Sequence, residues 1–131
     1  TGNSDATITP IQMAVAASAI SSGGIRPAPR IAIAVNSPTQ GWVILPAGQQ
    51  TRVFISEGID FAKDLLTDGI TPYWHTTAVV PTAEGASQWF VAGTLPNWQG
   101  TPLALAVILE GGNANSDTEV GFNLLNSVIQ Q

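Results

Sequence analysis

The sequence predicts an α+β fold in which an antiparallel sheet of three to five strands packs against helices. Three apolar segments follow one another closely, at residues 75–82, 87–93 and 103–110, and each has the length and residue types of a β-strand. The connection at 83–86 is short enough for a hairpin. The connection at 95–102 contains two prolines and a glycine, which do not extend a strand ladder. Helical patterns before and after these segments complete an α+β order.

The third apolar segment has the clearest period of two. One side carries large residues, and the other carries mostly small ones: Leu103, Leu105, Val107 and Leu109 against Ala104, Ala106, Ile108 and Glu110. Such an alternation is typical of a strand that is covered on both faces. We therefore expect a three-stranded meander at the centre of the domain.

The first helix is predicted at residues 10–20. Thr9 is a favourable N-cap, and Pro10 suits the first helical position, where an N–H group has no acceptor within the helix. Apolar or small residues lie on nearly all sides of this segment, so we expect a buried helix with close neighbours. Residues 21–24, Ser-Ser-Gly-Gly, end it because glycine accepts the left-handed conformation that follows many helices.

A proline-stiffened connection and a small hairpin are expected next. Residues 26–30 are Arg-Pro-Ala-Pro-Arg, and a residue before proline favours extended backbone. Residues 31–35 and 41–45 then pair around the turn at 36–40.

Two further helices flank the predicted meander. Ser56 is expected to cap a helix that runs to about Asp68 and ends at Gly69. Its predicted apolar face consists of Ile59, Ala62, Leu65 and Leu66. Residues 116–119 have capping-box spacing and begin the last helix. The predicted apolar stripe of that helix consists of Val120, Leu124, Leu125 and Val128. We expect the last helix on one face of the sheet and the helix at 10–20 on the other face or at its edge.

The composition favours one domain over residues 1–131. Hydrophobic residues form 44% of the chain and charged residues only 10%, against roughly a quarter charged in a typical domain. Two explanations stay open: an exterior rich in uncharged polar residues, or a surface that packs against more protein. Four basic and nine acidic residues give a formal net charge of −5, which argues against nucleic acid and anionic membranes as partners.

Several kinds of site are disfavoured by residue content. The chain has no cysteine, which excludes disulfides, thiolate metal sites and cysteine nucleophiles. Its one histidine, His75, has no Asp, Glu or Cys nearby in sequence, so we predict a packing residue. Nothing has the spacing of three or four converging metal ligands, and we predict neither a metal nor a cofactor. No apolar run approaches the roughly 18–20 residues that span a bilayer.

Two N-terminal segments resemble penicillin-binding transpeptidases. Residues 9–14 are Thr-Pro-Ile-Gln-Met-Ala, and residues 19–27 are Ala-Ile-Ser-Ser-Gly-Gly-Ile-Arg-Pro. They are similar to a helix, a Gly-Gly turn and a proline of that family. Residues 53–57 and the helix containing Leu65 and Leu66 resemble the family's next helix.

The strands extend the same resemblance. Residues 82–84, Thr-Ala-Glu, residues 89–93, Trp-Phe-Val-Ala-Gly, and the strand at 103–110 resemble three strands of the family, in its order. The resemblance covers essentially the whole chain. It implies the fold of the C-terminal portion of a transpeptidase (β-lactamase/transpeptidase-like) domain.

The three motifs of the family's chemistry are absent. That chemistry depends on a Ser-x-x-Lys nucleophile, a Ser-x-Asn loop and a Lys-Thr-Gly strand. The one lysine, Lys63, follows Asp60 instead of a serine at the third position back, and no Ser-x-Asn triplet occurs. Val79, Val80 and Pro81 stand where Lys-Thr-Gly belongs, and only Thr82 is kept of that strand motif. We therefore expect no catalytic residue in this chain.

Two residues are candidates for binding. Thr82 is the position kept from the strand motif. Trp98 lies in the loop with two prolines and a glycine, which makes it the best candidate for an exposed aromatic side chain. Trp89 is expected in the core.

Three functions stay open. The first, which we favour, is a non-catalytic transpeptidase-like module of a larger protein associated with the peptidoglycan cell wall. The second is the C-terminal fragment of an active DD-transpeptidase whose serine nucleophile lies upstream. The third is an unrelated small α+β binding domain. The resemblance implies an extracytoplasmic location, periplasmic or cell-surface, with membrane anchoring through a part that precedes Thr1. The expected partners are the remainder of a transpeptidase domain or another cell-wall protein.

Overall fold

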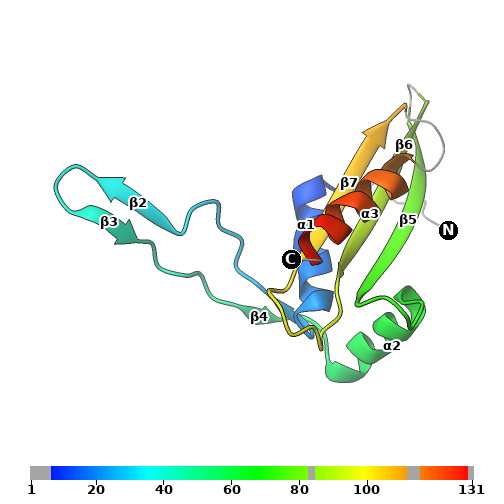
Figure 1. Ribbon diagram of the computed structural model, residues 1–131, viewed down its shortest axis with the longest axis horizontal. Helices are drawn as coiled ribbons and strands as arrows, with labels where there is room; N and C mark the ends of the chain where they lie inside the picture. The colour runs from blue at the N-terminus through cyan, green and yellow to red at the C-terminus, as the bar shows by residue number, and fades with distance from the viewer. Residues whose placement is uncertain (1–6, 83–84, 112–115, 130–131) are drawn as a thin grey trace.

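The computed structural model describes residues 7–82, 85–111 and 116–129. Its centre is an antiparallel meander of three strands in the order β5-β6-β7 (Figure 1). The strands are β5 (Tyr73–Thr82), β6 (Gly85–Thr94) and β7 (Ala104–Glu110). The predicted fold class and the three predicted strands are confirmed. The turn between β5 and β6 falls on residues 83–84, which lie outside the described residues.

The sheet is covered on both faces by helices. Helices α1 (Pro10–Ser21) and α3 (Ser116–Ile129) cross it on opposite sides (Figure 1). On the α3 side, Phe90 and Ala92 form a core with Leu125, and Leu105 and Val107 of β7 pack against it. The two sides are built from alternate residues of the same strands because strand side chains have a period of two.

The core on the α1 side is formed by Ala17, Trp74 and Val91. Ala104 of β7 packs against this core, as the small-residue side of that strand predicts. The half-buried Trp89 also packs there, as expected.

Helix α1 begins with the predicted cap. The Thr9 Oγ1 accepts a hydrogen bond from the Gln12 backbone N–H at 3.3 Å, and Gln12 Oε1 accepts one from the Thr9 N–H at 2.8 Å. These reciprocal bonds form a capping box, which satisfies two N–H groups at the helix start. The expectation of a buried helix is wrong for one side of α1. Ala17 and Ala19 are buried, but Ile11 is largely exposed.

A buried hydrogen bond ties α1 to the sheet. The Trp74 indole Nε1–H donates to Ser21 Oγ over 3.1 Å, and both residues are buried. Gly93 makes this approach possible, because a Cβ atom there would overlap Ser21 Oγ and lie 2.8 Å from the Leu103 carbonyl oxygen. Leu103 and Thr94 close the β6–β7 loop by two bonds of 3.0 and 3.1 Å.

Helix α3 uses a different face from the one predicted. Leu125 is buried as expected, but Val120, Leu124 and Val128 are exposed. The face toward the sheet contains Gly121 instead. The Phe90 ring lies where a side chain at position 121 would be, so the absence of a side chain lets α3 approach the sheet.

Helix α2 (Ser56–Leu66) also departs from the prediction. Ile59 is its buried residue, whereas Leu65 is 68% exposed. Ser56 is the first helical residue, and the N-cap is Ile55, which makes no side-chain capping bond. The helix ends at Leu66 because Asp68 begins a turn of its own.

The turn after α2 is organised by the Asp68 carboxylate. Its Oδ1 accepts hydrogen bonds from the Ile70 N–H, the Thr71 N–H and the Thr71 hydroxyl, each at 2.9 Å. Those bonds, the Thr71 N–H first, hold the pKa of Asp68 below its ordinary value.

His75 packs among aromatic side chains, as predicted. Its ring stacks on Phe90 at 5.8 Å and meets the Phe122 ring edge-on at 4.9 Å. This places the imidazole on the α3 side of the sheet.

Residues 27–50 form a long projection of two antiparallel segments, here called the arm. At its base β1 (Ile25–Arg26) pairs with β4 (Thr51–Arg52), and near its tip β2 (Ala34–Ser37) pairs with β3 (Gly41–Ile44). The predicted hairpin is confirmed there. The arm points away from the sheet (Figure 1), and the substantial contacts of β2 and β3 are with each other.

Gly121→Ala is expected to destabilise the fold by about 1–3 kcal/mol, because the new methyl group must displace the buried Phe90 ring. Gly58→Ala in α2 is the matched control, since its Cβ would meet only Ile55 Cγ1 at 3.8 Å. That variant should gain up to about 1 kcal/mol from helix propensity. Urea unfolding measures the free energy of unfolding of both variants. Equal effects of the two substitutions would contradict the packing of Gly121 against Phe90.

Ser21→Ala is expected to cost about 1–3 kcal/mol, because the buried indole N–H of Trp74 loses its acceptor. Ser18→Ala is the control: Ser18 Oγ donates to the Val15 carbonyl of its own helix over 2.6 Å, so its loss should be nearly neutral. Unfolding followed by tryptophan fluorescence compares the two. Similar free energies for both variants would show that the bond to Trp74 does not hold α1.

Asp68→Asn is expected to lower the melting temperature at neutral pH. A lowered pKa means that the carboxylate stabilises the fold above the ordinary aspartate pKa, and that this contribution is lost as pH falls through the lowered value. The difference between wild type and variant should therefore shrink under acid. The same substitution at Asp64, an exposed residue of α2, controls for the loss of one charge.

Candidate functional site

A groove of about 800 Å³ lies between α1 and the sheet. Its wall on the sheet is the α1-facing side of β5, which brings Trp74, Thr76, Ala78, Val80 and Thr82 to one face because they alternate along the strand. A large groove with a few polar groups is the usual form of a ligand site. We call it the sheet groove.

The lining of the sheet groove is mainly apolar and comes from α1, α2 and the three strands. It consists of Thr7, Ile8, Met13, Ala16, Ala17, Ile20, Leu66, Trp74, Thr76, Thr77, Ala78, Val80, Thr82, Ser87, Trp89, Val91, Ile108 and Glu110.

One row across the three strands carries the polar chemistry of the groove. Ser87 of β6 pairs with Val80 on one side and with Glu110 on the other, so the three side chains share a face. The Ser87 residue is buried, whereas Glu110 at the end of β7 is exposed. This row offers a hydroxyl group and a carboxylate to a bound molecule.

The sheet groove has no cationic group among its described lining residues. Lys63 lies on α2 and does not line it, and His75 packs on the opposite face of the sheet. Hydroxyl nucleophiles of the Ser–Lys type need a lysine within hydrogen-bond reach. The described groove can therefore hold a ligand but lacks the lysine of that chemistry.

Val79, Val80 and Pro81 lie within β5, opposite Gln88, Ser87 and Ala86 of β6. The valines are 68% and 46% exposed. Neither valine belongs to the hydrophobic core on either side of the sheet. Among the described strands β5 is an edge, which is where a strand tolerates a proline without an N–H group.

Of the two predicted binding residues, one lies in the sheet groove and the other does not. Thr82 lines the sheet groove at its exposed end. Trp98 is half-buried rather than exposed, because the loop folds on itself: the Trp98 N–H donates to the Leu95 carbonyl at 2.9 Å, and the indole lies against Gly100. The structure does not bring Trp98 to the groove.

Sequence reasoning missed Ser87 and Trp42. Ser87 was placed in a strand, but its position opposite Glu110 follows from the register of β6 and β7, which the sequence does not specify. Trp42 is 74% exposed on β3 and is the exposed tryptophan that was sought at position 98. The sequence signal for this exposed tryptophan was the run of uncharged residues around it.

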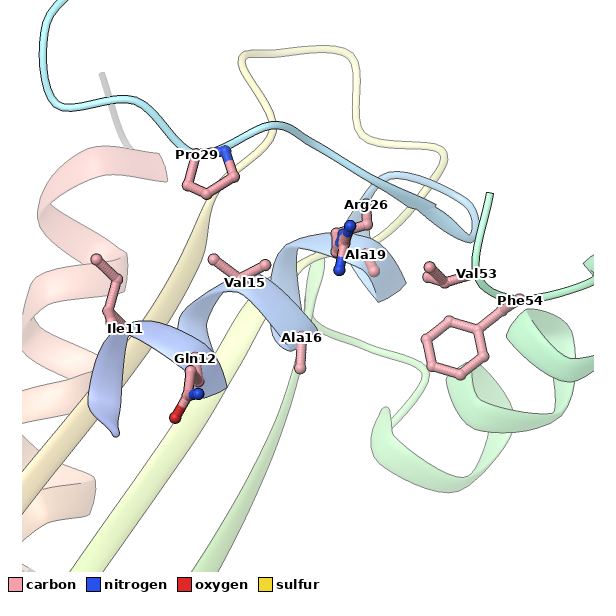
Figure 2. A pocket seen from close by; sticks show the side chains of 9 residues that line it. All are labelled: Ile11, Gln12, Val15, Ala16, Ala19, Arg26, Pro29, Val53 and Phe54. Carbon is pink, nitrogen blue, oxygen red and sulfur yellow. The ribbon is translucent and has the colours of Figure 1, made fainter. Parts of the chain in front are cut away.

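A second pocket, of about 490 Å³, lies on the outer side of α1 (Figure 2). Figure 2 shows side chains of α1 on one side and those of residues flanking the arm on the other. The lining is Ile11, Gln12, Val15, Ala16, Ala19, Arg26, Pro29, Val53 and Phe54. We call it the base pocket, because Arg26, Pro29, Val53 and Phe54 stand at the base of the arm.

Two kinds of feature are absent from the described part of the chain. Residues 7–82, 85–111 and 116–129 contain no group of three or more His, Cys, Asp or Glu side chains that could hold a metal ion. None of the helices described there is long and apolar enough to cross a membrane.

Comparison with known proteins gives the fold. No family model matches the chain. No curated protein matches it either. Among solved structures, penicillin-binding protein A from M. tuberculosis, in its imipenem acyl-enzyme complex, is similar with a TM-score of 0.68 at 20% sequence identity. The match covers 98% of this chain and 33% of that protein, so the chain spans about a third of its length. The chain therefore has the α+β fold of part of a penicillin-binding protein.

Proposed function

We propose that the chain is a non-catalytic, transpeptidase-like module of a larger, extracytoplasmic protein associated with peptidoglycan. One observation carries the proposal. Val79, Val80 and Pro81 occupy an exposed edge strand, at the positions where the transpeptidases that this sequence resembles have Lys-Thr-Gly. The sheet around this strand is intact, so the fold does not need Lys-Thr-Gly at these positions.

The chemistry of the groove supports an inert role. Acyl transfer needs an activated nucleophile and a preorganised site for the developing oxyanion. Ser87 and Thr82 supply hydroxyl groups, but the described lining contains no lysine or histidine to take their protons. Pro81 also has no N–H to offer a peptide laid along the outer edge of β5.

The exposed surface of the chain supports a module that packs against further polypeptide. The chain corresponds to a third of a protein that forms an acyl-enzyme with imipenem. The exposed apolar residues Val120, Leu124 and Val128 on α3 fit a surface that meets further polypeptide. The remainder of a transpeptidase-like domain, or another cell-wall protein, is the partner that this role implies.

The second candidate is the C-terminal part of an active DD-transpeptidase whose nucleophile lies in another part of the protein. Thr82 at the mouth of the sheet groove favours it, because that position is kept from the strand motif. The two candidates differ in whether the intact protein forms a covalent adduct with a β-lactam.

Labelling with a fluorescent penicillin and with imipenem separates them. We expect no covalent adduct on the intact protein, measured by gel fluorescence and intact mass, because no lysine-assisted hydroxyl is available in the described groove. A Ser-x-x-Lys transpeptidase labelled in parallel shows that the reagents are active.

An adduct would contradict the proposal, and its position in the protein would show which alternative is correct. Proteolytic mapping to a serine outside this chain would favour the active transpeptidase. An adduct within the chain that Ser87→Ala abolishes would identify the sheet groove itself as reactive.

A further inference from the structure

The arm exposes apolar side chains on both faces of a two-stranded hairpin. Trp42 and Ile44 share one face of β3 and are 74% and 81% exposed. Ile33 and Val35 are also exposed, and Val35 faces Val43 on the other side of the hairpin. An isolated two-stranded hairpin is marginally stable in water, so an arm with two apolar faces is suited to surroundings less polar than water.

The hairpin of the arm is uncharged, and basic residues stand on either side of it. Residues 31–51 contain no charged side chain, and Arg30 and Arg52 stand immediately on either side of them. With Arg26 of β1, three of the four basic residues of the chain lie at the base of the arm. Residues 6–56 contain no acidic residue, whereas the rest of the chain carries nine acidic residues and one lysine.

The base pocket continues the apolar surface of the arm. Its lining includes Ile11, Val53 and Phe54, all partly exposed, and among its described lining residues only Arg26 is charged (Figure 2). The apolar hairpin, the pocket and the arginines thus follow one another along the arm and its base.

From this arrangement we propose that the arm and the base pocket dock on the surface of a bilayer that contains anionic lipid. An apolar segment inserts at the boundary between headgroups and acyl chains, where tryptophan is favoured, and arginines beside it reach the lipid phosphates. The net charge of −5 predicts repulsion from such a surface. The three arginines and the absence of acidic residues from positions 6–56 reverse that prediction for the arm itself.

Lipid fits the two-faced arm better than a protein does. A protein that covers one face of the hairpin leaves the other apolar face in water, whereas an arm at the boundary between headgroups and acyl chains has lipid on both faces. A second copy is disfavoured because it would bring the arginines of two arms together. The uncharged tip, at Ser37 to Gln40, enters the polar headgroup layer without placing an ion there.

The test is co-sedimentation of the intact chain with phosphatidylcholine vesicles, with and without an equal amount of phosphatidylglycerol. We expect binding to the anionic vesicles, weakened by added salt. Arg30→Gln is expected to weaken it about fivefold, since one basic residue near the surface contributes about that factor. Trp42→Ser is expected to weaken it about tenfold through lost apolar burial.

Two variants serve as matched controls. Leu65→Ser removes an equally exposed apolar side chain on α2, and Lys63→Gln removes the one basic residue outside the arm and its base. Both should bind as the wild type does, and near-ultraviolet circular dichroism should show an unchanged fold for all four variants.

Three results would overturn the proposal. They are absence of binding to anionic vesicles, undiminished binding of Trp42→Ser, and an arm-dependent dimer in lipid-free sedimentation. The last would assign the arm to a protein partner. None of these results depends on whether the chain reacts with a β-lactam.

Discussion

Phe90 and Val91 are adjacent in the central strand, yet they belong to two different hydrophobic cores. Phe90 packs beneath α3, and Val91 packs with Trp74 beneath α1. A slip of one residue in the pairing of β6 would exchange these two faces and leave neither helix with a partner surface. The pairing register of this one strand therefore fixes both helices, and with them the wall of the sheet groove.

The elements that the sequence predicted well are those with a strong local signal. The capping box at Thr9 and the period of two in β7 both depend on residues close together in the chain. The error in α3 arose where a missing side chain decides the packing. Gly121 faces Phe90, so the buried face of α3 is not its most apolar face. The stripe of large apolar residues therefore predicted the wrong face of this helix. The same limit applies to the site: Thr82 could be predicted from its motif, whereas Ser87 beside Glu110 needs the register of two strands.

The fold of this chain does not depend on the side chains at positions 79–81. The three residues that differ from the transpeptidase strand motif are exposed on β5, so they could change without cost to either core. The sheet groove beside them has a volume of about 800 Å³ and a mainly apolar lining. It is therefore a surface on which a ligand or another polypeptide could bind.

Pro81 has a consequence for the behaviour of the protein in concentrated solution. Residues 76–80, Thr-Thr-Ala-Val-Val, form an uncharged, exposed edge with high β-propensity, the kind of segment that recruits identical copies into growing fibrils. An imino acid beside it interrupts the row of donors that a neighbouring copy would need. Pro81 thereby serves as a gatekeeper against aggregation.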